Sequence, residues 1–143
     1  MRIAAIPIAA TAVLAFHAHA AAPNMKEGLW EITAKSEMQG MPGGMPPTTM
    51  QQCITKKDLD DPSKTTPAAQ GDKRCKMTDY KLQGNTATWK MACEGENAMT
   101  GSGTITYTGS SYAGTQTMSM RLEGKALNMT VNFSGRHLGD CKK

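Results

Sequence analysis

From residue 75 to residue 135, apolar or small residues recur at every second position, and polar residues fill the positions between them. This period is typical of β-strands that turn one face toward a core. The pattern breaks at Gly84-Asn85, Gly109-Ser110 and Gly124-Lys125, which are dipeptides of the kind found in tight hairpin turns. The chain therefore predicts consecutive hairpins that build an antiparallel meander.

The first hairpin indicates a disulfide. Regular pairing outward from its turn leaves Cys75 one residue out of step with Cys93. The apolar pattern itself slips at Thr78-Asp79, as expected where a β-bulge inserts one residue into a strand. With that bulge Cys75 lies opposite Cys93, and we predict that the two are bonded.

The later hairpins follow the same alternation without a bulge. The second turn places Tyr107 opposite Tyr112, and the third places Leu122 opposite Leu127. Because a shift of one residue would move every side chain to the other face, the agreement of the apolar positions supports these pairings.

The first part of the domain predicts two more strands, Gly28–Met38 and Thr48–Ile54, joined by an irregular loop rich in glycine and proline at residues 39–47. The four residues from Thr55 to Asp58 match a capping box, so we expect one short helical turn in the excursion 55–73, running to about Leu59 and ended by Pro62.

The predicted fold is all-β, an antiparallel meander that curls into a small barrel or half-barrel. If the last strand pairs with Gly28–Met38, then Cys53 and Cys141 lie at the same end of the sheet. A second disulfide between them is therefore expected.

Residues 1–20 have the basic start, the apolar stretch and the Ala18-His19-Ala20 ending of a secretory signal peptide. We expect them to be removed, leaving one domain at residues 21–143 that is periplasmic or secreted. No second hydrophobic run is long enough to span a membrane. The exported part carries a net charge of +3 without a basic stripe, so we expect no binding to nucleic acid.

Composition changes the expected core. The exported part has only 11 Ile, Leu, Val and Phe residues but 11 methionines. Methionine is flexible enough to fill irregular interior space, so we expect methionines to replace aliphatic residues in the core.

Catalytic residues are scarce. His137 is the one histidine left after residues 1–20 are removed, and the four cysteines are expected to be oxidised. We therefore predict a protein that is not an enzyme and has no cofactor.

Three binding roles fit the residues. The first is a small apolar ligand, with Trp89 given room by its neighbour Gly103 and the lining drawn from Trp30, Trp89, Tyr107, Tyr112 and Phe133. The second is Cu(I), because thioether sulfurs suit this soft ion and a Met-rich loop offers Met38, Met41, Met45 and Met50. The third is an envelope protein partner, for instance a cell-wall enzyme inhibited through the loop 39–47.

Motifs spread in order over almost the whole exported chain carry a family resemblance: Gly28-Leu29-Trp30-Glu31, Cys53-Ile54-Thr55, Gly84-Asn85 with Trp89 and Cys93, Met99-Thr100-Gly101 and Gly139-Asp140-Cys141. They resemble the family of small exported Gram-negative bacterial proteins catalogued as DUF3617. The resemblance implies a periplasmic address and a β-rich domain with disulfides. It implies no activity, so no catalytic or ligand residues are carried over, and residues 60–73 are more polar than is usual in that family.

Overall fold

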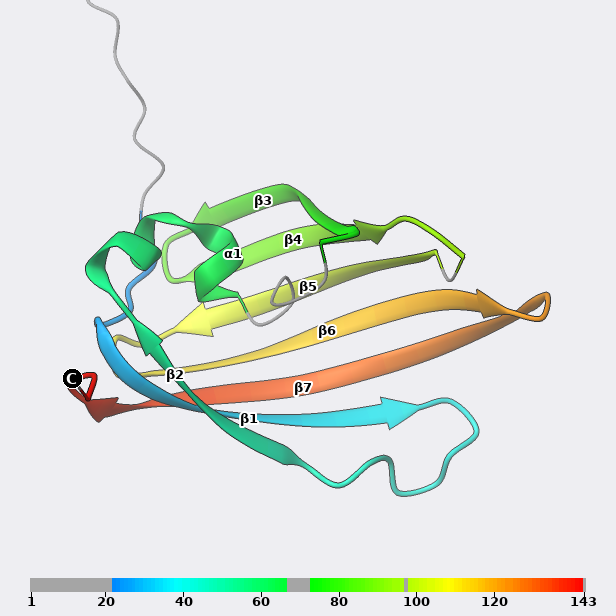
Figure 1. The fold of residues 1–143 in the computed structure, drawn as a ribbon, viewed down its shortest axis with the longest axis horizontal. Coiled ribbons are helices and arrows are strands. Elements are labelled where there is room, and N and C mark those ends of the chain that lie inside the picture. The colour runs from blue at the N-terminus through cyan, green and yellow to red at the C-terminus, as the bar shows by residue number, and fades with distance from the viewer. Residues whose placement is uncertain (1–21, 67–72, 97, 143) are drawn as a thin grey trace, which may run out of the picture.

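The structure, a computed structural model, describes residues 22–66, 73–96 and 98–142. These ranges form one antiparallel sheet in the order β2-β1-β7-β6-β5-β4-β3 (Figure 1). The strands are β1 (Gly28–Met38), β2 (Thr48–Ile54), β3 (Cys75–Gln83), β4 (Thr86–Cys93), β5 (Met99–Tyr107), β6 (Ser111–Leu122) and β7 (Lys125–Gly139). The expected signal peptide, residues 1–20, lies outside the described residues.

The meander is confirmed, but the prediction of a barrel or half-barrel is wrong. The sheet is neither closed nor strongly curled, and β2 and β3 remain its two edges (Figure 1). Closure would require these edges to pair. Instead the chain after β2 packs onto the core: Thr65 and Thr66 are buried, and the Tyr107 hydroxyl donates a hydrogen bond to the Thr65 carbonyl at 3.4 Å.

This covering segment contains a 3₁₀ turn, η1 (Lys56–Asp60), and a short helix, α1 (Pro62–Thr65). The predicted capping box is present, since Thr55 and Asp58 each accept a hydrogen bond from the other's backbone N–H. Pro62 does not end a helix as expected; it begins α1, with Asp61 as the N-cap. Proline suits the first helical position because its missing N–H would have no partner there.

The first two hairpins have the predicted registers. Cys75 pairs with Cys93, and the irregularity lies between Thr78 and Lys81, where Asp79 has φ 51°. Tyr107 pairs with Tyr112 across the second turn. The predicted alternation and the presence of a bulge are therefore confirmed, but the extra residue lies at Asp79-Tyr80, one position after the predicted Thr78-Asp79.

The predicted register of the third hairpin is wrong by two residues. Leu122 pairs with Lys125 rather than with Leu127, because Glu123 and Gly124 form the turn with φ of 50° and 79°. Two consecutive residues with positive φ are typical of the type I′ turn that suits strand twist. A shift of two residues preserves the face on which each side chain lies. The alternation of apolar and polar residues is therefore the same in both registers and cannot distinguish them.

Two disulfides stabilise the sheet. Cys75–Cys93 lies within the first hairpin, and Cys53–Cys141 joins β2 to the segment that follows β7. These are the pairings expected from the strand order. Disulfides persist in oxidising compartments, so both are consistent with an exported protein.

Candidate functional site

The five aromatic residues expected to line a ligand slot lie in one cluster on the covered part of the sheet. Trp30 stacks on Tyr112 with ring centroids 5.4 Å apart, and Tyr112 contacts both Tyr107 and Phe133, at 6.1 and 6.4 Å. Trp89 belongs to the same cluster through Phe133, since the centroids of these two rings lie 6.3 Å apart. All five are at most 4 % exposed. The rings pack against one another as the core, and their role as ligand lining stays a prediction.

Burial also fixes the protonation state of two of these rings. Loss of solvent raises the pKa of both Tyr107 and Tyr112 well above its ordinary value of 10. Both hydroxyls therefore stay neutral at physiological pH, and the Tyr107 hydroxyl donates its hydrogen bond to the Thr65 carbonyl.

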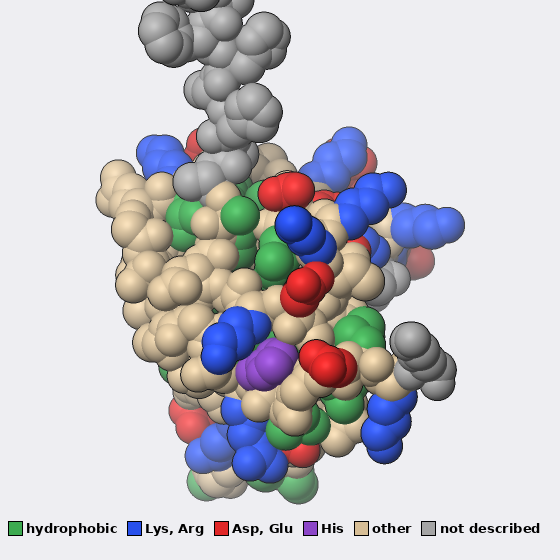
Figure 2. All heavy atoms as spheres, turned by 90° about the vertical axis from the view of Figure 1, so that its left-hand side faces the viewer, with side chains coloured by type: hydrophobic (Ala, Val, Ile, Leu, Met, Phe, Trp, Pro, Cys, Tyr) green, Lys and Arg blue, Asp and Glu red, His purple; other side chains and the backbone are tan. Residues whose placement is uncertain are grey.

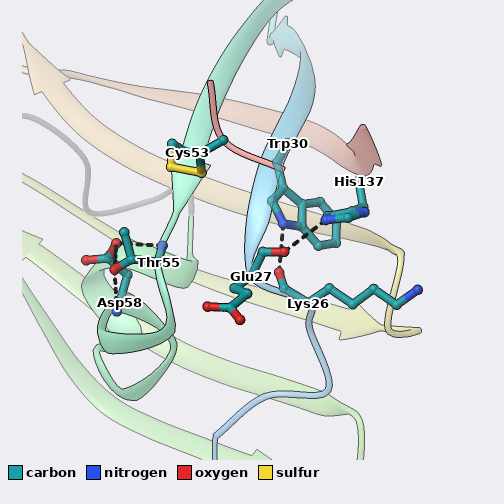
Figure 3. The surroundings of a disulfide bond; sticks show 8 residues. Lys26, Glu27, Trp30, Cys53, Thr55, Asp58 and His137 are labelled. Atoms are coloured by element: carbon teal, nitrogen blue, oxygen red, sulfur yellow. Dashed lines mark hydrogen bonds between the residues drawn. A yellow bond between two sulfur atoms is a disulfide. The ribbon is translucent and has the colours of Figure 1, made fainter. Parts of the chain in front are cut away.

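At the end of the sheet where β1 begins, Trp30 and His137 hold the preceding chain segment (Figure 3). The Trp30 Nε1–H donates to the Lys26 carbonyl, and His137 Nε2 donates to the Glu27 carbonyl, both at 2.9 Å. Their rings lie 5.6 Å apart, next to the strand that carries Cys53. His137 is thereby given a structural role in joining β7 to the start of β1.

The surface at that end has no charge of one sign gathered on it: Figure 2 shows Lys and Arg side chains interspersed with Asp and Glu. One close ion pair joins Arg136 to Glu31 across β7 and β1, with Nη2 and Oε1 2.6 Å apart. Side chains of both charges therefore share this face.

The opposite end of the sheet carries methionines in register. On the core side, one row runs across six strands in the order Met38, Met129, Met118, Gly101, Met91 and Met77. The next row toward the β6–β7 turn contains Leu127, Met120, Met99 and the Cys93–Cys75 disulfide. We call these two rows the methionine face. None of its residues is charged.

The methionine face is only partly buried. Met91 and Cys93 are each 5 % exposed, whereas the other methionines and Leu127 are partly exposed. In Figure 1, η1 and α1 lie at the other end of the sheet, near the start of β1. Among the described residues, no helical element lies over the methionine face.

The proposed Cu(I) ligands do not all lie together. Met41 follows Met38 closely, with its N–H donating to the Met38 carbonyl at 3.1 Å, and the Met45 N–H donates to the Ser36 carbonyl at 2.9 Å. Met50 pairs with Ile32, six residues from Met38, or roughly 20 Å along the strand. Met41 and Met45 thus lie in the loop that follows Met38, whereas Met50 lies apart from them on β2, and Cu(I) binding stays a prediction.

Reasoning from the sequence placed most of these methionines on the core side but missed their alignment in one row. That row depends on the third hairpin, where Met118 pairs with Met129, whereas the predicted pairing of Leu122 with Leu127 would put Val131 opposite Met118. A Glu-Gly dipeptide before Lys125 was the signal that could have located the turn one residue earlier.

Within residues 22–66, 73–96 and 98–142, no group of three or more His, Cys, Asp or Glu residues is arranged to hold a metal ion. In the same ranges, no helix combines the length and apolarity needed to cross a membrane.

Comparison with known proteins places the chain in a family without assigning an activity. No curated protein and no solved structure gave a match. The model of a family described as "Protein of unknown function (DUF3617)" matches residues 25–141. This range begins just before β1 and ends at Cys141 of the second disulfide, so it covers every strand. The chain therefore belongs to the DUF3617 family.

Proposed function

We propose that this protein is a non-enzymatic binding module of the exported proteome that holds a small apolar ligand on the methionine face. The observation that carries the proposal is the row of five methionines aligned across the sheet, four of which are partly exposed. Apolar surface gathered in one place commonly marks a binding site.

Methionine side chains support this role for a physical reason. Each has three rotatable bonds and a polarizable sulfur, so a methionine surface can adapt its shape to a ligand. The aromatic end of the same face supplies a rigid, closely packed support, since its rings are almost fully buried. The aromatic end of the sheet is thereby rigid, and the methionine end can adapt to a ligand.

The test measures binding of N-phenyl-1-naphthylamine, whose fluorescence rises in apolar surroundings. The full exported chain is compared with Met118→Gln/Met129→Gln, a paired substitution at the centre of the methionine row. The control is Thr117→Gln/Thr130→Gln, the neighbouring pair on the other face of the same strands. We expect the first variant to bind about tenfold more weakly and the control to bind as the wild type does.

Thermal unfolding of all three proteins checks that the fold is retained. Absence of probe binding to the wild-type chain would overturn the proposal, as would equal affinity of the two variants. Native mass spectrometry of the protein taken directly from the periplasm provides the second readout, in which we expect a bound species below about 1 kDa, the range of ligands that fit such sites. A stoichiometric protein partner at this face instead would favour the envelope-partner hypothesis.

A further inference from the structure

The Trp89 side chain has a buried donor without an acceptor. Its indole is 2 % exposed, and Nε1 has no hydrogen-bond partner, the one such buried side-chain nitrogen or oxygen in the described part of the chain. By contrast, the Trp30 indole donates to the Lys26 carbonyl at 2.9 Å. Buried donors are almost always satisfied, so an orphaned one calls for a partner.

A second polar group lies in the same row. Gln116 is 5 % exposed, and its side-chain amide takes part in none of the hydrogen bonds formed among the described residues. A primary amide can both donate and accept hydrogen bonds, whereas an indole can only donate. The sheet therefore holds a buried donor and, in a nearly buried residue, an adaptable amide, and neither has a hydrogen-bond partner among the described residues.

The strand register brings these two groups to opposite sides of a glycine. Trp89 on β4 pairs with Gly103 on β5, which pairs in turn with Gln116 on β6. A Cβ at Gly103 would lie 2.2 Å from Trp89 Cζ2, so the indole lies over β5 and extends toward β6. The strands β4 and β6 are two apart and therefore separated by roughly 10 Å, and the indole ring covers most of this distance.

This polar pair adjoins the methionine face. Met91 is the next core-side residue after Trp89 on β4, and Met118 is the next one after Gln116 on β6. From β1 to β4 the row consists of Ser36, Val131, Gln116, Gly103 and Trp89, and neither these residues nor the methionine face carry a charge. On β3 the irregularity leaves Asp79 and Tyr80 opposite Trp89, where the Asp79 carboxylate is exposed and already paired with Lys90 Nζ at 3.2 Å. A ligand that reached the pair with an ionised group would lose its hydration without gaining a counter-ion.

The chemistry of the ligand follows from these three properties. It must present an acceptor to the indole N–H, be uncharged there, and have a hydrocarbon part for the methionines. We infer that Trp89 and Gln116 form the polar anchor of the binding site, and that the ligand is a neutral molecule with a carbonyl-type oxygen next to a hydrocarbon chain, such as an ester or a ketone. This inference depends on the proposed function and specifies its ligand class.

The test compares three probes of equal chain length with the full exported protein: hexadecane, methyl palmitate and palmitate. Two variants remove the polar groups of the anchor: Trp89→Phe keeps an aromatic ring without the indole N–H, and Gln116→Leu keeps the size of the side chain without the amide. We expect the wild type to bind methyl palmitate about tenfold more tightly than hexadecane, as one added hydrogen bond provides. Both variants should lose this preference and keep the affinity for hexadecane, measured by displacement of the naphthylamine probe.

A direct readout of the hydrogen bond comes from the indole protons in ¹⁵N-labelled protein. The exported chain has two tryptophans, and Trp30 is an internal reference because its N–H is already bonded. Methyl palmitate should move the Trp89 indole resonance downfield, while hexadecane should leave it unchanged. A folded spectrum of each variant shows that the loss of preference is not caused by unfolding.

The outcomes separate the two proposals. If ester and alkane bind equally well to the wild type, the anchor is refuted and the methionine face remains a binding surface. If palmitate binds more tightly than its methyl ester, the requirement for an uncharged group is wrong. If none of the three binds, the proposed function itself fails.

Discussion

Three aromatic rings of the core lie over glycines of the neighbouring strand. A Cβ built on Gly103, Gly114 or Gly135 would lie within 2.5 Å of the nearest carbon of Trp89, Phe133 or Tyr112, respectively. Real Cβ atoms do not approach a ring so closely, so each glycine is required by its partner's size. Glycine weakens a strand by itself, and here that cost is offset by the ring that occupies the vacated space.

Substitution of Gly103 tests this arrangement. Gly103→Ala should lower the free energy of unfolding by about 1 to 3 kcal/mol, because the buried indole must shift out of a close-packed position. The matched control is Ser102→Ala, the adjacent outward-facing residue, for which we expect a change below about 0.5 kcal/mol. Urea denaturation followed by tryptophan fluorescence measures both. An unchanged midpoint for Gly103→Ala would show that the indole has room to move.

The sequence allowed one of these pairs to be predicted and not another. The sequence correctly predicts Trp89 beside Gly103, because apolar residues mark both ends of the loop between their strands and so fix the register of the two strands. Extending the predicted pair Leu122 and Leu127 along the hairpin puts Phe133 opposite Gln116, whereas it lies opposite Gly114, because the third turn lies one residue earlier and the register therefore differs by two.

At the level of elements, the segment between β2 and β3 decides how the core is closed. Its order comes from two local caps, the reciprocal Thr55 and Asp58 hydrogen bonds before η1 and the Asp61 side chain that accepts from the Ser63 N–H at 2.9 Å before α1. Caps satisfy backbone donors that would otherwise lack partners at a helix start. They allow two very short helical elements to keep a defined position on the sheet.

The capping box predicts a dependence on pH. The hydrogen bonds from the Thr55 hydroxyl and backbone hold the pKa of the Asp58 carboxyl below its ordinary value of 3.8. Because the folded state favours the carboxylate, its contribution is present above the unfolded pKa and is lost as the pH falls through the folded pKa. A double-mutant cycle of Thr55→Val and Asp58→Asn should therefore give a stabilising coupling at pH 7 that disappears near pH 2.

NMR titration of Asp58 supplies the independent check on this coupling. In Thr55→Val the pKa of Asp58 should rise toward its ordinary value. A coupling that persists unchanged at pH 2, or a pKa that does not respond to Thr55→Val, would contradict the assignment.

On the scale of the whole molecule, an open sheet with two free edges is held by disulfides of different reach. Cys75–Cys93 closes a loop of 18 residues within one hairpin, while Cys53–Cys141 closes a loop of 88 and joins the edge strand β2 to the end of the chain. A longer closed loop restricts the unfolded chain more strongly.

Removing the disulfides one at a time tests this difference. By the chain-entropy relation, Cys53→Ala/Cys141→Ala should lower the free energy of unfolding by about 4.6 kcal/mol and Cys75→Ala/Cys93→Ala by about 3.2 kcal/mol. Both are measured by urea denaturation of the oxidised proteins. Cys93 is also buried, so its packing adds to the second value. A smaller loss for the long-range pair than for the hairpin pair would show that strain or packing outweighs loop entropy.

The all-β class, the bounds of β1 and β2, two of the three tight-turn hairpin registers and both disulfide pairings could be predicted from the amino-acid sequence alone. These features depend on a local period, on turn residues and on bulge position, which the chain carries within short stretches. Where the turn chemistry was ambiguous, as at Glu123-Gly124, the alternation could not detect a shift of two residues.

That the sheet stays open and that the methionines form one row is known from the three-dimensional structure and could not be predicted from the sequence. Closure of the sheet depends on whether β2 pairs with β3 or the segment 55–66 packs over the core. These alternatives involve distant parts of the chain, so the local alternation of apolar and polar residues does not distinguish them. The row from Met38 to Met77 likewise requires the registers of five neighbouring strand pairs to be correct together. A single shifted hairpin breaks it, so the proposed binding surface became visible only when the whole sheet was assembled.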